Sequence, residues 1–350
     1  MTVYCGVDFH ARKQTISYLT IEDGEIQQAE LLHEKDDIRA FYAKLLSQGQ
    51  VVVGFETSGY AAWFEELLEE LGCEIWIGFP AEIRRRARRR QKNDRRDADL
   101  ILELMVRGDF PRLHRYTPES RQVLQQLRYR HRLVKLRTIV VNSLQFMALS
   151  RGLSLRTKLL TKRGQERMRQ LVLPVHLEQQ RDELCQLLVT LTQKIETAQY
   201  WLEQRAKQDP RVLRLMTHPG IGPLTGLCLV YTLDSVERFA NPRKVTADVG
   251  FDPVEDSSGE RQRIGSISKQ GSRLLRFLLV EAGQIAARHD QDLKAVYWRV
   301  QLRRNHQKAK VAVARRLLVR LSSCCEMRSI MLNSNDVASQ LGLPEEPRRL

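Results

Sequence analysis

Four acidic residues, Asp8, Glu56, Asp94 and Asp97, occupy positions where a folded chain could gather them into one site. The first two directly follow short apolar segments with β propensity, and the last two lie near the start of an expected helix. At about 100° per residue, Asp94 and Asp97 are about 60° apart around a helix and share a face. Asp99 is about 140° from Asp94 and points elsewhere. We therefore select the first pair.

Clustered carboxylate oxygens are donors that suit Mg²⁺ or Mn²⁺, and two such ions about 3.5–4 Å apart stabilise both the attacking and the leaving oxygen at a phosphate. Each acid taken alone has an ordinary explanation as a turn cap, a surface charge or an ion-pair partner of Arg90 or Arg96. Without a metal, four converging carboxylates would repel one another. Their order in the chain, beside a basic run, favours a metal site.

The basic run extends from Arg84 to Arg96 and places nine positive charges in thirteen residues. Like charges at this density repel one another unless phosphates neutralise them, so the run predicts nucleic-acid contact rather than a solvated helix face. The residues assigned to this contact are Arg84, Arg85, Arg86, Arg88, Arg89, Arg90 and Lys92. A second basic stretch, Arg121 to Arg137, adds Arg128 and Arg132.

A glycine-rich segment in the second half, Pro219 to Gly222, resembles the hairpin of a helix-hairpin-helix element. Backbone N–H groups in such a hairpin hold a phosphate without reading sequence. Gly220 and Gly222 are therefore candidate contacts, with a structural tight turn as the alternative. The basic segment further along the chain supplies four more candidates, Arg261, Arg263, Lys269 and Arg273.

Two adjacent serines, Ser257 and Ser258, precede Gly259 in a polar stretch. A Ser-Gly turn alone is usually structural. Here the flanking arginines and a metal cluster could remove the hydroxyl proton and stabilise the charge that develops at phosphorus. A nucleophilic serine is therefore a second chemical hypothesis.

Alternating β-prone and helical patterns would position the acids. We expect strands at Val3–Val7, around Ile16 and Tyr18, and at Ile26–Leu32, a helix at Asp37–Leu46, a strand at Val51–Phe55, a helix at Ala61–Leu71, a strand at Cys73–Phe79, and a last helix that begins in the arginine run. This βββαβαβα order is that of an α/β ribonuclease-H-like fold. There the first strand is central, the fourth lies beside it and the last helix packs across them, which would bring the four carboxylates together.

The middle of the chain, Thr117 to about Gln208, is predicted to be helical with an interruption from Ser150 to Pro174. Two offset heptad series occupy a and d positions, with Arg181 standing where the second series should begin. The series are Leu177, Leu184, Leu191 and Ala198, and Leu188, Ile195 and Leu202. We favour a coiled coil between subunits, with an amphipathic helix packed within its own domain as the alternative.

Glycine-rich turns and short helices are expected from Met216 onward. Leu274–Ala287 and Ala309–Leu321 read as closing helices, and the sequence after Leu332 reads as a frayed tail. The predicted division is 1–112, 113–210, 211–332 and a tail at 333–350. The third part is expected to be mostly α-helical.

Composition bounds the class of protein. The 350 residues include 42% apolar and 28% charged residues, which excludes a disordered or collagen-like chain, and a net charge of +15 favours a polyanionic partner. No signal-peptide pattern or long apolar run is present, so we expect a soluble cytoplasmic protein with no membrane partner. The six cysteines form no CxxC pair and are expected to be reduced and buried.

The motifs together resemble the DEDD-type transposases of bacterial insertion sequences, relatives of the Piv-like DNA invertases. In the first half the resemblance rests on Gly6-Val7-Asp8, Phe55 to Tyr60 and Lys92 to Ala98. In the second half it rests on segments that follow the family's order: His218 to Gly222, Arg238-Phe239, Gly250 to Pro253, Ser257 to Gly259, Ile267 to Gly271 and Leu275-Arg276. The resemblance covers nearly the whole chain. Asp252 departs from it, because the family usually has an apolar pair where Phe251 and Asp252 stand.

The resemblance implies a recombinase with a RuvC-like first domain, a coiled-coil middle and a C-terminal domain carrying a nucleophilic serine. It implies that Asp8, Glu56, Asp94 and Asp97 hold Mg²⁺ while Ser258, with Ser257 as the runner-up, forms a transient phosphoserine link to DNA. It also implies an element-encoded noncoding guide RNA, donor and target DNA, and a dimer or tetramer that associates with the nucleoid when active. The alternatives are a metal-dependent junction nuclease that uses water and a non-catalytic nucleic-acid-binding protein.

Overall fold

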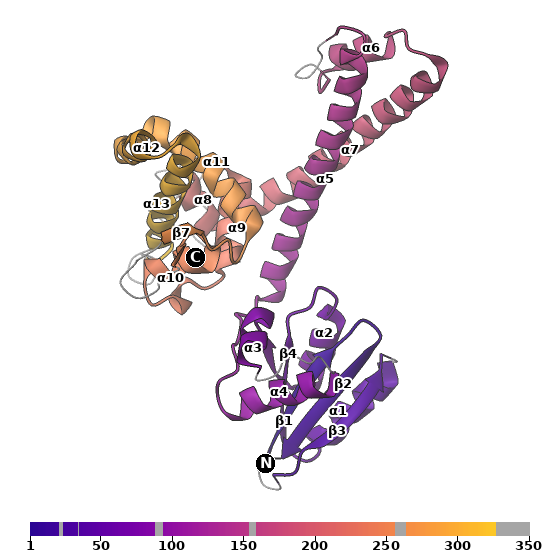
Figure 1. The fold of residues 1–350 in the computed structure, drawn as a ribbon, viewed down its shortest axis with the longest axis vertical. Helices are drawn as coiled ribbons and strands as arrows, with labels where there is room; N and C mark the ends of the chain where they lie inside the picture. Colours follow the sequence, from indigo (N-terminus) through magenta and orange to yellow (C-terminus); the bar gives the residue numbers. More distant parts are fainter. Residues whose placement is uncertain (21–23, 34, 88–93, 154–158, 256–263, 327–350) are drawn as a thin grey trace, which may run out of the picture. The chain divides into compact units, whose positions relative to one another are not determined.

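A computed structural model describes the 350-residue chain except for residues 21–23, 34, 88–93, 154–158, 256–263 and 327–350 (Figure 1). The chain separates into two compact units, Met1–Arg115 and Tyr116–Leu350. The finer four-part division of the sequence stays a prediction.

The first unit is built on a five-stranded mixed sheet of order β3-β2-β1-β4-β5. Its strands are β1 (Thr2–Phe9), β2 (Lys13–Thr20), β3 (Gln27–Leu32), β4 (Gln50–Glu56) and β5 (Glu74–Gly78). The first three strands are antiparallel neighbours, whereas β1, β4 and β5 are parallel. The sequence predicts all five strands, and β1 lies at the centre of the sheet with β4 beside it, as expected.

Helices cover both faces of this sheet. In the described part of this unit they are α1 (Lys35–Leu46), α2 (Ala62–Leu71), α3 (Pro80–Arg86) and α4 (Asp94–Val106). Alternation along β1 sends Val3, Cys5 and Val7 into an apolar core with α1 and α2. The opposite face packs against α3 and α4, and Gly6 lets the α4 backbone approach closely, since an added Cβ would lie 2.5 Å from the Leu102 nitrogen.

The arginine run differs from its prediction. The sequence predicts a helix that begins within the run, but α3 ends at Arg86 and α4 begins at Asp94. Apolar Ile83 is buried in α3, so the first arginines form the end of a short helix anchored on the sheet. The acids Asp94 and Asp97 do occupy the first turn of a helix, as predicted.

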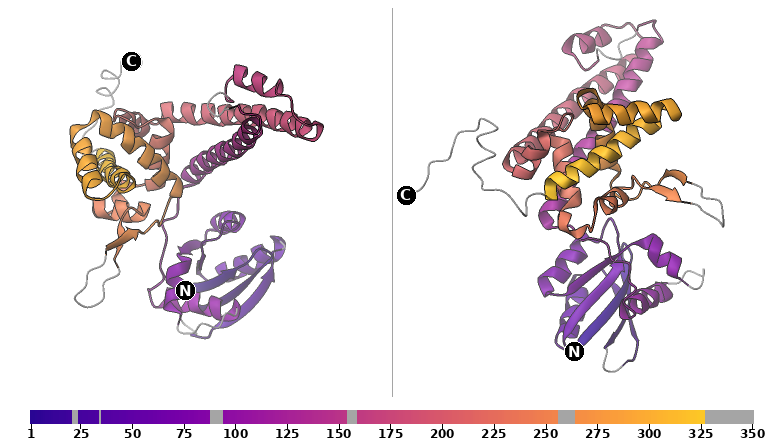
Figure 2. Two further views of the ribbon diagram at one scale, coloured as in Figure 1. Left: turned by 45° about the horizontal axis from the view of Figure 1, so that its top comes forward. Right: turned by 90° about the vertical axis from the view of Figure 1, so that its left-hand side faces the viewer.

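The second unit begins with a long helical hairpin, α5 (Pro118–Leu149) and α7 (Val175–Gln208), joined through α6 (Lys162–Arg169) (Figure 2). The Thr117 side chain caps α5 by accepting a hydrogen bond from the Ser120 N–H. The predicted interruption between Ser150 and Pro174 separates the two long helices as expected.

The heptad stripe of α7 packs within its own chain, and the predicted coiled coil between subunits stays a prediction. Leu188 and Leu202 are fully buried and Ile195 is 4% exposed within the single chain. Leu188 and Ile195 pack with Leu144 and Val140 of α5, and Leu202 packs near Leu127. The heptad stripe of α7 is therefore covered by α5, so the packing within one chain already buries these apolar side chains.

Arg181, which interrupts the heptad series, is itself buried. It donates hydrogen bonds to the Leu171 carbonyl over 2.7 Å and to both Asp182 carboxylate oxygens over 2.8 and 3.1 Å. The polar residue thus ties the start of α7 to the chain segment that precedes it.

A helical core completes the unit. Its elements are α8 (Pro210–Met216), α9 (Pro223–Leu233), the short 3₁₀ helix η1 (Val236–Arg238), α10 (Pro242–Val249), β6 (Pro253–Glu255), β7 (Ile264–Ile267), α11 (Arg273–His289), α12 (Gln291–Arg303) and α13 (His306–Glu326). Helices α11 and α13 match the two closing helices of the sequence analysis, whereas α12 is not anticipated. The buried helix α9 packs at the centre, and α5 and α7 contribute to the same core.

Within the described residues, no helix is both long and apolar enough to span a membrane.

Candidate active site

The carboxyl ends of β1 and β4 meet at one edge of the sheet because these neighbouring strands are parallel. They carry Asp8 and Glu56 to a cavity of about 820 Å³ that is also lined by Asp97 from α4. Arg84 and Arg85, at the end of α3, complete its polar wall. The structure thus brings three of the four predicted acids to one cavity.

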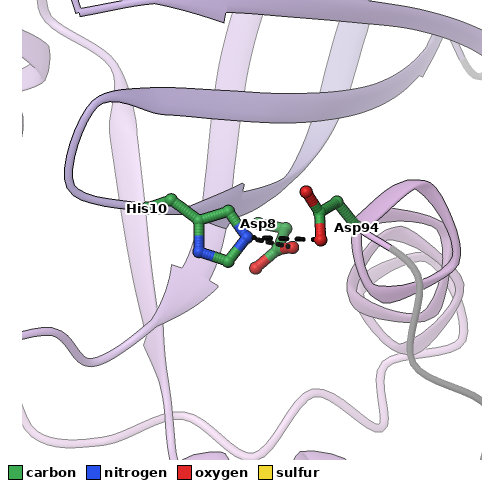
Figure 3. A group of neighbouring side chains, drawn as sticks. All are labelled: Asp8, His10 and Asp94. Atoms are coloured by element: carbon green, nitrogen blue, oxygen red, sulfur yellow. Dashed lines mark ion pairs between the residues drawn. The ribbon is translucent and has the colours of Figure 1, made fainter.

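The fourth acid, Asp94, approaches the same strand end through His10. His10 Nε2 lies 3.1 Å from Asp8 Oδ2 and 3.5 Å from Asp94 Oδ1 (Figure 3). The three side chains offer ligand atoms that all lie within 4.8 Å of one another. This spacing permits one cation to be bound by all three.

Lys13 on β2 fixes Asp94 from the other side. Its ammonium group lies 3.3 Å from Asp94 Oδ2 and 3.0 Å from Glu30 Oε1. The hydrogen bond from Lys13 is the main cause that holds the pKa of Asp94 below its ordinary value, with His10 adding to it and desolvation opposing it. Asp94 is therefore a carboxylate at neutral pH, which is the form that binds a metal.

Asp99 faces away from this cluster, as the helical spacing predicts. It accepts hydrogen bonds from Ser17 Oγ over 2.6 Å and from Gln28 Nε2 over 2.8 Å. These contacts fasten α4 to β2 and β3, so Asp99 has a structural role that its neighbour Asp97 does not share.

Two residues of this site, His10 and Lys13, are missed by the sequence analysis. Their spacing offers a weak signal, since His10 follows Asp8 by two residues and Lys13 opens the next strand. Only the antiparallel pairing of β1 with β2 places Lys13 and His10 beside the same acid, Asp94. The set of carboxylates fits a hard divalent cation, and an imidazole donor is more typical of softer metals than of Mg²⁺.

The described arginines of the basic run are exposed and partly engaged. Arg84 Nη2 is 3.9 Å from Glu56 Oε2, Arg85 pairs with Glu82 over 2.5 Å, and Arg86 donates to the Asp109 carbonyl. Their exposure leaves room for phosphate contacts beside the acids. The predicted contacts Arg88, Arg89, Arg90 and Lys92 lie outside the described residues.

The second unit carries further basic residues at the surface. Arg128 and Arg132 are exposed on α5, and Lys269 and Arg273 are exposed near the start of α11. Burial and the positive charges of Lys135, Arg130 and Arg273 lower the pKa of His131 on α5. The basic surface of α5 thus extends to Arg273 on α11.

The structure does not describe the predicted serine site. Ser257, Ser258, Arg261 and Arg263 belong to residues 256–263, which lie outside the described residues between the paired strands β6 and β7. Near this pair, Asp252 accepts a hydrogen bond from Ser268 Oγ over 2.7 Å. The departure at Asp252 therefore has a structural use, because it links the residue before β6 to the residue after β7.

The glycine-rich hairpin connects α8 to α9. Gly220 has a φ of +84°, and a Cβ there would lie 2.5 Å from the Ala282 carbonyl oxygen of α11, so close packing accounts for this glycine. Gly222 is the N-cap residue of α9, and nothing lies within 4 Å of the position that its Cβ would take. The two glycines thus differ in packing, and phosphate contact by Gly220 and Gly222 stays a prediction.

A basic surface missed by the sequence analysis spans α12 and α13. From Leu293 to Cys325 the sequence contains no Asp or Glu. Seven of its basic residues are exposed, namely Lys294, Arg299, Arg303, Arg304, Lys308, Arg315 and Arg316. The absence of acids over this span was a usable sequence signal.

Two models of known protein families match the chain. A model described as Transposase, for the DEDD-type IS110 enzymes, matches residues 5–149, and a model described as Transposase IS116/IS110/IS902 family matches residues 212–298. Together they account for more than half of the chain. The chain belongs to the IS116/IS110/IS902 transposase family. It is therefore an enzyme of the class that moves DNA by cutting and rejoining strands.

Curated relatives of this transposase carry matching descriptions. A probable family 20 transposase of Pseudomonas aeruginosa is 27% identical over 269 residues, which cover 73% of the chain and 76% of the relative. The transposase for insertion sequence element IS1111A of Coxiella burnetii is 28% identical over 64% of each chain. The transposase for element IS1328 of Yersinia enterocolitica is 29% identical over 67% of the chain and 70% of the relative.

Proposed function

We propose that this transposase cuts and rejoins DNA of its own insertion sequence through a phosphoserine intermediate, with a RuvC-like, ribonuclease-H-like first unit that uses a divalent metal. The observation that carries the proposal is the convergence of Asp8, Glu56 and Asp97 on one cavity, with Asp94 close to Asp8. Strand order 3-2-1-4-5, with β1 central and α4 packed across it, supports the fold assignment.

The residues present fit a divalent cation. Asp8 and Asp94 both lie close to His10, and the Lys13 ammonium group beside Asp94 offsets part of the repulsion between the two carboxylates. Bound there, Mg²⁺ or Mn²⁺ would supply charge stabilisation at a phosphate. Asp8, Glu56, Asp94 and Asp97 would hold the cation, and Arg84 and Arg85 would orient the DNA backbone.

The covalent reaction assigned to Ser258 exchanges one phosphate ester for another and needs no external energy source. The serine oxygen forms a bond to phosphorus as the bond from phosphorus to one deoxyribose oxygen breaks, and that oxygen leaves as a hydroxyl with a proton. A deoxyribose hydroxyl of another strand then attacks the phosphoserine and restores the serine hydroxyl. One phosphate ester replaces another at each step, so strands can be exchanged without nucleotide hydrolysis.

Exposed basic residues on both units support several nucleic-acid partners. The net charge is +15, and exposed basic residues lie on α3, α5, α11, α12 and α13. An element-encoded guide RNA paired with donor and target DNA would be held chiefly through phosphates, while base pairing would read the sequence. A dimer or tetramer associated with the nucleoid belongs to the same proposal.

Substitution of Asp8 tests the metal assignment. We expect Asp8→Asn to abolish strand cleavage and to leave salt-dependent nucleic-acid binding largely intact, because one ligand is lost and the basic surface is unchanged. The measurement is cleavage of labelled flanking DNA with Mg²⁺, beside a filter-binding assay over a range of salt. Cleavage by the purified variant equal to that by the wild-type protein would contradict the metal assignment.

A further inference from the structure

An exposed tyrosine ring lies beside the carboxylates of the candidate active site. Tyr60 lines the same 820 Å³ cavity as Asp8, Glu56 and Asp97, four residues after Glu56 in the chain. Its side chain is 52% exposed, although it belongs to a segment that joins buried β4 to α2. A large ring is thus presented to solvent where the acids converge.

The Tyr60 ring is held by a buried ring beneath it. Its centroid lies 5.9 Å from that of Phe9, with 27° between the two planes, and Phe9 is 7% exposed. Phe9 in turn stacks on His33 at 4.8 Å and on Phe64 at 5.1 Å. The buried rings support Tyr60 from below, and its exposed surface borders the cavity.

An exposed aromatic face beside a phosphate-binding site suits a nucleobase. Every base has a π face, and stacking on an aromatic side chain does not depend on sequence. A base inside an intact duplex is already stacked on its neighbours, so only an unpaired base can take up this place. The cavity volume is within the range of sites that hold small organic groups.

We propose that Tyr60 stacks on an unpaired nucleobase next to the phosphate that the carboxylate site engages. The transposase would then bind DNA at a nick, a strand end or a locally opened base pair in preference to uniform duplex. Tyr60 is a positioning residue in this account, because it holds the nucleotide and takes no part in bond exchange. The inference rests on the proposed function of the carboxylate site.

A binding experiment with a fluorescent base tests this inference. The probe is a DNA duplex with one unpaired 2-aminopurine, titrated with the full chain in Ca²⁺ in place of Mg²⁺ and compared with a fully paired duplex of the same length. Stacking quenches 2-aminopurine fluorescence. We expect Tyr60→Ala to weaken binding of the unpaired probe about tenfold and to remove the quenching, with binding of the paired duplex unchanged.

Two variants serve as controls. Tyr60→Phe keeps the ring and should stay within about twofold of the wild-type affinity. Tyr200→Ala removes a ring that is 65% exposed on α7 and should change neither signal. A melting curve for each variant checks that the chain is folded.

Either of two results overturns the inference: Tyr60→Ala quenches and binds the unpaired probe as the wild-type protein does, or it loses affinity equally for both probes. Failure of the proposed function has a different signature, since cleavage retained by Asp8→Asn contradicts the metal assignment whatever Tyr60→Ala does.

Discussion

Asp97 and Asp99 lie two residues apart on α4 and face different surroundings. Asp97 lines the cavity with Asp8, whereas Asp99 is hydrogen-bonded to Ser17 and Gln28 of the sheet. The same residue type therefore serves the site at one position and the attachment of the helix at the other.

This difference makes Asp99 a matched control for Asp97. We expect Asp97→Asn to lower the cleavage rate by about two orders of magnitude or more, because a charged metal ligand is lost. Asp99→Asn should retain cleavage, since an amide can still accept from Ser17. Single-turnover cleavage of labelled DNA measures both rates, and a greater loss in Asp99→Asn than in Asp97→Asn would reverse the assignment.

At the level of single residues, the sequence identifies acids better than their partners. Helical spacing alone separates Asp97 from Asp99. His10 and Lys13 are not found, because their contact with Asp94 depends on the strand pairing and on where α4 crosses the sheet. The roles of Ser257 and Ser258 stay predictions from motif resemblance.

At the scale of elements, the contact of α4 with β1 sets the distance between the acids. Gly6 makes this contact possible, because an added Cβ would meet the α4 backbone at Ala98 and Leu102. The neighbouring Gly54, paired with Gly6 across the two strands, would instead meet the flexible side chain of Met105.

We therefore expect Gly6→Ala to lower the free energy of unfolding by about 1–3 kcal/mol, because backbone cannot yield as a side chain does. Cleavage should fall as well, because the added methyl group would displace α4 and so move Asp94 and Asp97 away from Asp8. Gly54→Ala should cost less stability and keep activity. Hydrogen exchange of α4 peptides in the full-length protein measures the effect, and equal protection in the two variants would refute the close-approach argument.

The helical hairpin illustrates why a heptad pattern does not name its partner. An apolar stripe is buried equally well by a second chain or by another helix of the same chain, and in this structure α5 covers it. Helix α12 was missed for a related reason, because Leu293 is its only fully buried residue among those described, which leaves little periodicity to detect.

Neighbouring leucines of α7 test this intrachain packing. Leu188→Ala removes a fully buried side chain and should lower the free energy of unfolding by about 2–5 kcal/mol, with no change in mass while the protein is folded. Leu187 is 43% exposed, so Leu187→Ala should change the free energy of unfolding by no more than about 0.5 kcal/mol. Denaturant unfolding and light scattering together distinguish packing within one chain from packing between subunits. A lower mass for folded Leu188→Ala would indicate that this stripe joins subunits in a coiled coil.

At the scale of the whole molecule, the first family match covers most of the first unit and continues through α5 of the second, whereas the second match lies wholly in the second unit. The first match, 5–149, includes the carboxylate site, and the second, 212–298, includes the segment with Ser258. Composition predicted the polyanionic partner, and the order of the strands predicted the architecture that gathers the acids.

The most direct measurement is a search for a covalent protein–DNA adduct. Purified protein, Mg²⁺, RNA transcribed from the flanks of its gene and labelled flanking DNA are incubated and run on denaturing gels. Wild type is compared with Ser258→Ala, Ser257→Ala and Asp8→Asn. The account predicts an adduct that requires RNA, persists in Ser257→Ala and disappears in Ser258→Ala and Asp8→Asn. Metal-dependent cleavage without an adduct, unaffected by Ser258→Ala, would contradict it and indicate a nuclease that uses water.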